Sequence, residues 1–178
     1  MPIRGIITVL LLLPSFLTAQ NSAQRDVWEP FRYFVGSWEG TGKGQPGVSK
    51  TLREYKFVLN GKFLHVQNRS VYEPQAKNAK GEVHEDWGLL SFDKSRKQFV
   101  LRQFHVEGFV NQYVQTTSSP DGKTFVFVTE HIENIAAGWR ARETYRIVSP
   151  DEFVEIFELA APGADFESYS EGRYTRKK

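Results

Sequence analysis

The sequence contains no cysteine. Disulfide bonds, a cysteine nucleophile and the acylated cysteine of a lipoprotein anchor are therefore all excluded. A chain without disulfides depends for its stability on the burial of an apolar core. The chain of 178 residues is long enough to form such a core within one domain.

An excess of charge of one sign is also missing. The 23 Lys and Arg residues nearly balance the 21 Asp and Glu residues, and the two signs are interspersed. Nucleic-acid-binding proteins usually carry a basic patch or stripe, so we expect no nucleic-acid partner. The sequence has neither a phosphate-binding glycine loop nor a Gly-x-Ser-x-Gly motif, and its four histidines are scattered. These absences favour a binding protein over an enzyme.

Long apolar runs are scarce. The most extended run, residues 6–13, follows a basic residue and is closed by a proline, and it is too short to span a bilayer. This layout predicts a secretory signal peptide over residues 1–20, with an uncleaved N-terminal anchor helix as the alternative. We therefore expect export to the periplasm or the cell exterior, and one mature domain over residues 21–178 without a membrane span.

Short runs rich in β-branched and aromatic residues recur along the rest of the chain, separated by turn signals. Such spacing is typical of all-β sandwiches and barrels. Residues 27–34 predict a short N-terminal helix, which Pro30 keeps from extending. The predicted strands span residues 37–45, 49–59, 62–72, 84–92, 97–106, 109–118, 123–132, 138–148, 152–160 and 166–176.

The connections between these runs predict antiparallel neighbours. Asn60-Gly61 favours a type I′ hairpin because both residues tolerate positive φ, and the connections are too short for crossover helices. About ten sequential antiparallel strands leave two exposed edges unless the sheet closes on itself. We therefore predict an all-β fold, a closed antiparallel up-and-down barrel, with a filled two-sheet sandwich as the alternative.

The start of the first predicted strand carries a distinctive motif. Residues 36–42 read Gly-Ser-Trp-Glu-Gly-Thr-Gly, and a short helix followed by Gly-x-Trp-x-Gly-x-Gly resembles the opening of the calycin-like, or lipocalin-like, barrels. Trp38 suits a plug at the closed end of such a barrel. Gly36 and Gly40 allow bending or a close backbone approach where a strand turns a corner, so these three residues are assigned structural roles.

Two branches of these barrels resemble the chain. One is a widespread bacterial family of unknown function, which is similar over residues 57–64, 88–100 and 157–177. The other is the nitrobindin family of ten-stranded haem-binding barrels, whose axial histidine lies near the last strand. That position falls at or near Tyr169 here, and no histidine follows His131. The resemblance implies a barrel that binds a small molecule, with haem as an alternative to a cofactor-free barrel.

The two-residue turn predicts which side chains of the first long hairpin face inward. It pairs Tyr55 with Val66 and Arg53 with Asn68, and directly opposed residues share one face of the sheet. The apolar pairs of this hairpin should face the core, and they carry Arg53 and Asn68 inward with them. His65 is then predicted to face solvent.

Strand 138–148 alternates most clearly. Three arginines share one face and belong in water, so Trp139, Glu143 and Tyr145 are predicted to point inward. A lone inward carboxylate must be hydrogen-bonded or paired. Glu143 is therefore either a satisfied core residue, with Arg53 as a suitable ion-pair partner, or a polar anchor for a ligand.

The remaining strands add further inward candidates. In strand 97–106, Gln103 and His105 are predicted to face inward and Arg102 outward. Residues 84–86, His-Glu-Asp, offer potential metal ligands, but adjacent strand residues face opposite sides, so this segment is interpreted as a solvated strand entry and no metal site is predicted. The candidate ligand-binding residues are Arg53, Tyr55, Asn68, Trp87, Gln103, His105, Tyr113, Trp139, Glu143 and Tyr145.

Taken as a whole, the sequence predicts an exported, non-catalytic barrel that binds a small hydrophobic or amphipathic molecule. One alternative is haem binding in the manner of nitrobindin. A second is catalysis by an interior acid–base pair of Glu143 and His105. A third is an interaction module without a ligand. The sequence does not identify the ligand.

Overall fold

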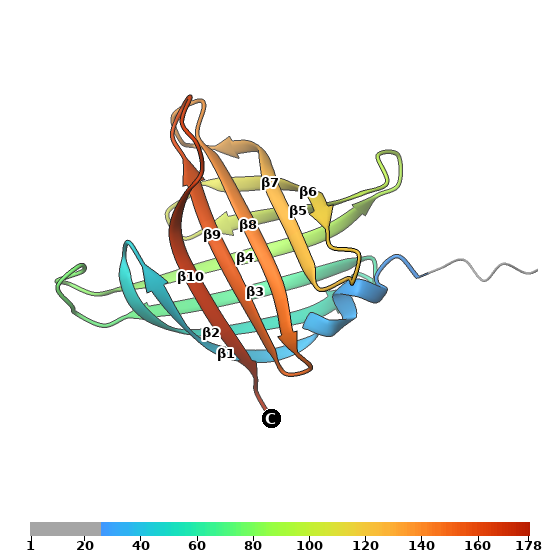
Figure 1. Cartoon of the computed structure of the whole chain (residues 1–178), viewed down its shortest axis with the longest axis horizontal. Helices are drawn as coiled ribbons and strands as arrows, with labels where there is room; N and C mark the ends of the chain where they lie inside the picture. Colours follow the sequence, from blue (N-terminus) through green and yellow to red (C-terminus); the bar gives the residue numbers. More distant parts are fainter. Residues whose placement is uncertain (1–25) are drawn as a thin grey trace, which may run out of the picture.

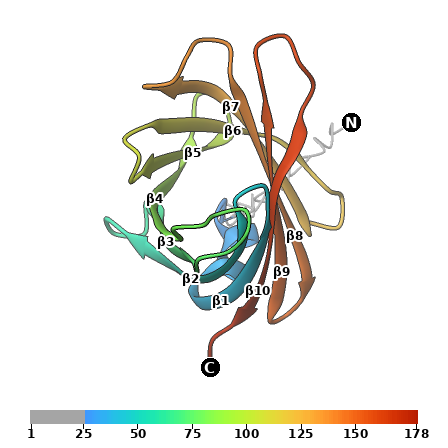
Figure 2. The same ribbon diagram turned by 90° about the vertical axis from the view of Figure 1, so that its left-hand side faces the viewer.

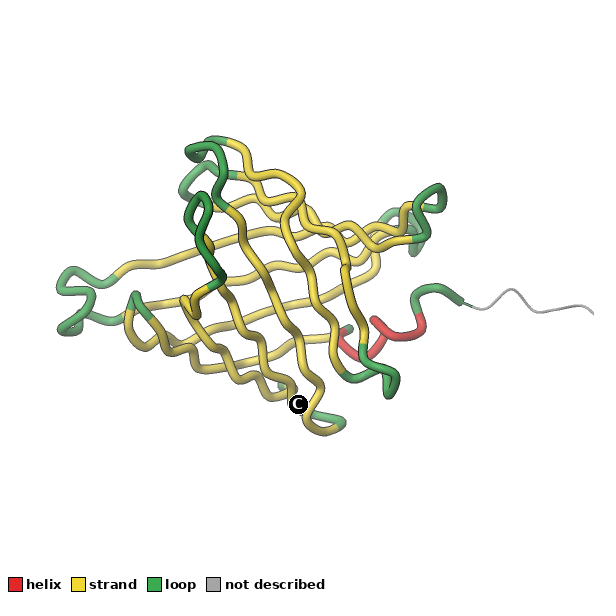
Figure 3. Tube along the Cα trace, turned by 45° about the horizontal axis from the view of Figure 1, so that its top comes forward, coloured by secondary structure: helices red, strands yellow, loops and turns green. Residues whose placement is uncertain are grey.

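A computed structural model describes residues 26–178 of the chain. The predicted signal peptide lies outside the described residues. Ten antiparallel strands follow a short 3₁₀ helix, η1 (Glu29–Phe34). Figures 1 and 3 show the helix beside one end of the strands. The strands are β1 (Gly36–Gly44), β2 (Gly47–Val58), β3 (Phe63–Tyr72), β4 (Glu82–Asp93), β5 (Gln98–His105), β6 (Val110–Ser118), β7 (Thr124–Glu133), β8 (Arg140–Ser149), β9 (Glu152–Ala160) and β10 (Glu167–Arg176).

The sheet closes into a barrel. Each strand pairs with its sequence neighbours, and β1 also pairs with β10 from Trp38↔Arg176 to Gly44↔Ser170. Seen from one end, the strands form a ring (Figure 2). The predicted closed up-and-down barrel of ten strands is confirmed, and closure excludes the two-sheet sandwich. Within the described residues, no helix is long and apolar enough to cross a membrane.

The turn between β2 and β3 sets the register of the first long hairpin. Leu59, Asn60 and Gly61 all have positive φ, at 50°, 56° and 73°, so the loop is longer than the predicted two-residue turn. It is still symmetric about Asn60-Gly61, and the register pairs Tyr55 with Val66 as predicted. An even number of loop residues preserves which side chains face inward.

Aromatic side chains fill one end of the barrel. Phe31 and Phe34 of η1 are buried, and they pack against rings from the surrounding strands, including Phe125 and Phe153. The remaining space beside η1 amounts to only about 30 Å³. The predicted helix at residues 27–34 is therefore a 3₁₀ helix that closes this end of the barrel, as its position in Figure 1 shows.

Trp38 lies at the centre of this closed end. Its side chain is fully buried, its indole Nε1 donates a hydrogen bond to the Phe34 carbonyl at 2.7 Å, and its ring packs on Phe153 at 4.8 Å between centroids. Gly40 is required nearby because a Cβ there would lie 2.7 Å from the Tyr174 ring. Gly36 has a φ of 119°, which a side chain would disfavour.

Replacing Trp38 by alanine should strongly destabilise the barrel, because it removes a buried aromatic side chain and leaves a cavity at the closed end. We expect Trp38→Ala to lower the free energy of unfolding by about 3–5 kcal/mol. Trp87→Ala, at an exposed tryptophan, should change it by less than about 1 kcal/mol. Urea denaturation followed by circular dichroism measures both. Equal effects would contradict the structural role of Trp38.

Candidate functional site

The half of the barrel away from η1 is hollow. A cavity of about 380 Å³ lies there, lined by residues from all ten strands or the loops that follow them. On β2, for example, Arg53 lines the cavity, whereas Tyr55, further along the strand, already packs against Phe34 of η1. The interior is thus divided into a filled aromatic half and an open half.

The lining of the cavity combines polar and apolar side chains. Most of the polar and charged side chains come from β2 to β6 and β10. Apolar side chains come from β7 to β9 and from the loops before β6 and after β7. The buried polar residues include Arg53, Asn68, Asp86, Gln103, Asn111, Glu143 and Glu155, and the apolar residues include Phe109, Ile132, Ile135, Phe157 and Leu159.

A buried ion pair lies at the base of the cavity. Arg53 Nη1 is 2.8 Å from Glu155 Oε2, and both side chains are about nine-tenths buried. Arg53 also donates from Nε to Asn68 Oδ1 at 3.0 Å and from Nη1 to the Tyr55 hydroxyl at 3.3 Å. Its guanidinium stacks over the Tyr174 ring at 4.5 Å. These contacts supply the partners that a buried charge requires.

Arg53 therefore pairs with Glu155 and not with Glu143, the partner that the sequence suggests. Glu155 takes that place because β9 lies next to β10, and Tyr174 of β10 positions both members of the pair. Glu143 instead accepts a hydrogen bond from the Tyr145 hydroxyl. Burial, reinforced by the negative charge of Glu155, raises the pKa of Glu143 to about 8, so at neutral pH this residue is mainly an uncharged acid.

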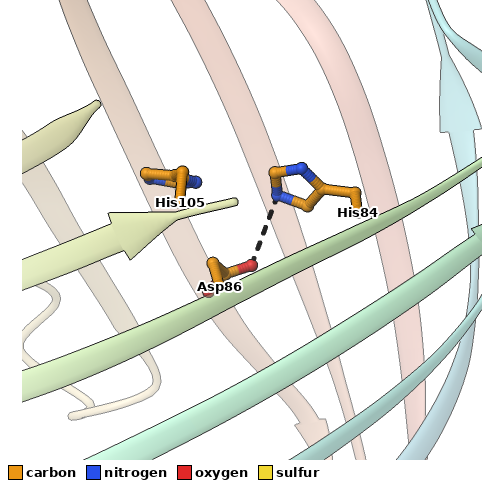
Figure 4. Close-up of side chains that lie close together, drawn as sticks. All are labelled: His84, Asp86 and His105. Carbon is orange, nitrogen blue, oxygen red and sulfur yellow. Dashed lines mark ion pairs between the residues drawn. The ribbon is translucent and has the colours of Figure 1, made fainter. Parts of the chain in front are cut away.

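A second polar cluster lies on the wall formed by β4 and β5 (Figure 4). Buried Asp86 accepts a hydrogen bond from Asn68 Nδ2 at 2.8 Å. His84 Nε2 is 3.4 Å from Asp86 Oδ2, and His84 Nδ1 is 2.8 Å from Glu107 Oε1. Burial lowers the pKa of His84, but the interactions with the two carboxylates outweigh it and raise the pKa to about 9.

The interpretation of residues 84–86 as a solvated entry is wrong for two of the three. Residues two apart on a strand share a face, so His84 and Asp86 both point into the cavity while Glu85 pairs with Arg69 outside at 3.1 Å. The two-residue spacing of His84 and Asp86 is the sequence signal that could have placed both side chains inside the barrel. Trp87 obscures this signal, because its apolar side chain favours the alternation in which residues 85 and 87 face inward.

Trp87 does not face the interior. It is 59% exposed, whereas Asp86 and Gly88 point inward. Trp87 pairs directly with Phe104 across the β4–β5 hairpin, and directly opposed residues share a face. Gln103 and His105 face inward as predicted, so Phe104, which lies between them, faces outward. Because Trp87 pairs with Phe104, Trp87 faces outward as well.

The other predicted residues fall at three levels. Arg53, Asn68, Gln103, His105 and Glu143 line the cavity. Tyr55, Tyr113 and Tyr145 are buried one layer deeper, and Tyr113 accepts a hydrogen bond from Asn111 Nδ2 at 2.9 Å. Trp139 precedes β8, is half-buried and is not part of the cavity lining, because the regular alternation begins only at Arg140. Their roles in ligand binding remain predictions.

Three buried polar atoms in the described residues have no hydrogen-bond partner: Gln103 Oε1, His105 Nδ1 and Asn111 Oδ1. All three residues lie on β5 or β6 and line the cavity. Unpartnered buried polar groups are rare because they carry a desolvation penalty. Their concentration on one wall marks this wall as the place where a bound group would supply the missing partners.

Comparison with known proteins agrees with the fold. Residues 27–176 match the family model described as "THAP4-like, heme-binding beta-barrel domain", which corresponds to the second of the two resemblances seen in the sequence. No curated protein matches the chain.

Two solved structures illustrate the likeness. The crystal structure of Rv2717c from M. tuberculosis is 19% identical, with a TM-score of 0.66 over 85% of this chain and 97% of that one. A de novo designed fluorescence-activating β-barrel is 14% identical, with a TM-score of 0.43 over 82% of this chain and 95% of its own. The likeness to Rv2717c shows a shared fold.

The raised pKa of Glu143 predicts a pH-dependent stability. The folded state holds this proton more tightly than the unfolded state, so the stabilisation is complete below pH 4.5 and is lost as the pH rises toward 8. Glu143→Gln should remove this loss. Between pH 5 and pH 8, the free energy of unfolding of the wild type should therefore fall by on the order of 2 kcal/mol more than that of the variant.

Urea titrations at several pH values measure this difference. Glu85→Gln, which removes an exposed carboxylate from the neighbouring wall, serves as the control and should leave the pH dependence of the wild type unchanged. A pH dependence that is the same in Glu143→Gln and wild type would contradict the assignment of a proton to Glu143 in the folded state.

Proposed function

We propose that this chain, which belongs to the family of THAP4-like, heme-binding β-barrel domains, is an exported, non-catalytic protein that binds one small amphipathic molecule in the open half of its barrel. The observation that carries the proposal is the mixed lining of the cavity, in which buried polar side chains are combined with apolar side chains of β7 to β9 and the adjoining loops. Export is supported by the N-terminal signal-peptide pattern, which lies outside the described residues.

The dimensions of the cavity suit a small organic ligand. Its volume of about 380 Å³ falls in the range of roughly 300–1,000 Å³ that is usual for such pockets. A purely apolar molecule is disfavoured, because it would cover the Arg53–Glu155 pair and the buried amides without replacing their lost contacts with water. The apolar part of the ligand therefore belongs against the apolar side chains of β7 to β9, such as Phe157 and Leu159.

The base of the cavity sets the chemistry of the polar end of the ligand. Gln103 Oε1 is a buried acceptor without a partner, so it favours a ligand group that donates a hydrogen bond. Glu143 lies on the same lining and is mainly protonated at neutral pH because burial raises its pKa to about 8. A hydroxyl or amide group, which both donates and accepts, would satisfy both residues.

The proposal can be tested by narrowing the cavity at its apolar wall. Ile132 is half-buried and lines the cavity, whereas the adjacent His131 is exposed. We expect the amphipathic dye 1-anilinonaphthalene-8-sulfonate to bind wild-type protein saturably, Ile132→Trp about tenfold more weakly, and the control His131→Trp within about twofold of wild type. Fluorescence titration measures the three affinities. Equal affinity of a folded Ile132→Trp variant would contradict binding inside the barrel.

Haem, the group named in the family description, is the second candidate. Five side chains on the cavity lining are of types that can ligate haem iron: His84, His105, Tyr72, Tyr169 and Tyr174. Both ring nitrogens of His84 face carboxylates. Burial raises the pKa of all three tyrosine phenols, which disfavours the phenolate that binds iron. Tyr169 also packs against Phe157.

His105 fits the requirement better than His84, because neither of its ring nitrogens pairs with a carboxylate: Nδ1 has no partner and Nε2 lies 3.3 Å from Asn111 Nδ2. Its ring stacks on Phe109 at 4.2 Å between centroids, which fixes its plane. A bound haem would supply an iron centre for gas binding or electron transfer. The chain's own part would be to ligate the iron through His105 and to shelter the ring against the apolar side chains of β7 to β9.

Titration with haemin tests this candidate. If haem is a ligand, a Soret band should shift and sharpen at one equivalent, and His105→Ala should weaken binding by about tenfold or more. His65→Ala, which removes an outward-facing histidine, should have no effect. The absence of any change in the Soret band would remove haem and leave the primary proposal intact.

A further inference from the structure

We infer that His84, Asp86 and His105 form a binding site for a divalent transition-metal ion, with zinc as the ion that suits the ligand set best. One ligand atom from each residue lies within 4.8 Å of the other two. Figure 4 shows the three side chains converging on the cavity side of the wall. The inference does not depend on the proposed amphipathic ligand.

The two strands hold the three residues in register. His84 and Asp86 are two residues apart on β4 and so share the inner face, while His105 on β5 is the direct cross-strand partner of Asp86. The backbone therefore fixes the three Cβ positions before any ion binds. Sites built on paired strands in this way keep their geometry better than sites on loops.

The separation of His84 from Asp86 suits a shared ion. Their nearest atoms, Nε2 and Oδ2, are 3.4 Å apart, which is long for a direct hydrogen bond. Two ligands at about 2.0–2.1 Å from a tetrahedral zinc ion are roughly 3.3–3.4 Å apart. The ligand atom of His105 lies within 4.8 Å of the other two, so its side chain must move closer to complete the site.

The surrounding hydrogen bonds orient the ligands as in known metal sites. Glu107 Oε1 lies 2.8 Å from His84 Nδ1, so that Nε2 is the nitrogen turned toward Asp86. Asn68 Nδ2 holds the Asp86 carboxylate at 2.8 Å. Metal-bound histidines usually donate their second ring nitrogen to a carboxylate in this way, and ligating carboxylates are themselves hydrogen-bonded.

The unpartnered atoms provide an independent observation. His105 Nδ1 and Asn111 Oδ1 both lack partners, while Asn111 Nδ2 lies 3.3 Å from His105 Nε2. Turning the Asn111 amide by 180° lets Oδ1 accept a hydrogen bond from His105 Nε2–H and leaves the lone pair of Nδ1 free for a metal. In the turned amide, Oδ1 also accepts a hydrogen bond from the Tyr113 hydroxyl, in place of the bond that Nδ2 otherwise donates to it. Asn111 is 2% exposed, so bulk water does not supply the hydrogen bond that its side-chain oxygen lacks.

The ligand types select the class of ion. Two imidazoles and one carboxylate bind zinc, iron and other transition metals, whereas magnesium and calcium prefer oxygen ligands. Three protein ligands leave at least one coordination position directed into the cavity. Gln103, two residues before His105 on the same face, has a free Oε1 that can accept a hydrogen bond from a metal-bound water.

Isothermal titration of the metal-free full chain, without an affinity tag, tests the inference with zinc chloride alone as the ligand. We expect one zinc ion per chain with a dissociation constant in the micromolar range or below. Asp86→Asn and His105→Gln should each weaken binding at least about tenfold. His65→Gln and His131→Gln, which alter histidines outside the cluster, should bind as wild type does.

Cobalt substitution adds a readout that folding defects do not mimic. The wild type should show the visible absorption bands of a cobalt ion with nitrogen and oxygen ligands, and Asp86→Asn and His105→Gln should lose them while their far-ultraviolet circular dichroism stays native. Magnesium chloride should give no binding heat. The inference is overturned if wild type binds no zinc, or if folded Asp86→Asn and His105→Gln bind zinc as tightly as wild type.

Discussion

The pairing of β1 with β10 is the constraint on which the rest of the structure depends. It removes both free edges of a ten-stranded sheet and fixes the circumference of the barrel. A ring of this size encloses more volume than the side chains of the strands fill alone. The extra segment η1 fills one half with aromatic rings, and the other half remains a cavity.

The boundary between the two halves explains why charged residues can lie so deep. Tyrosine hydroxyls project from the top of the aromatic layer, and they contact the carboxylates and the guanidinium at the base of the cavity. Each buried charge therefore has partners, as with Arg53 between Glu155 and Tyr174. The atoms that lack partners are, within the described residues, confined to β5 and β6. That wall is where the amphipathic ligand and the metal ion are both proposed to make contact.

Much of the fold followed from local sequence signals. All ten strands lie within two residues of their predicted bounds, and Asn60-Gly61 gave the correct register for Arg53 and Asn68. The alternation in β8 placed Glu143 inside. The apolar character of Trp87 predicts an inward position, but its direct pairing with Phe104 places it on the outer face. On the outer face of a barrel, large aromatic residues can be exposed, so residue type alone does not decide orientation.

The sequence by itself determined the strands, their antiparallel order and, for most of them, the face that each side chain occupies, because turn chemistry and alternation are local properties. The partners of those inward side chains were decided only by the tertiary structure. Arg53 meets Glu155 rather than Glu143, and His84 and Asp86 come together with His105. The physical reason is that barrel closure and strand stagger bring distant strands to the same depth inside the barrel, and no local pattern records that depth.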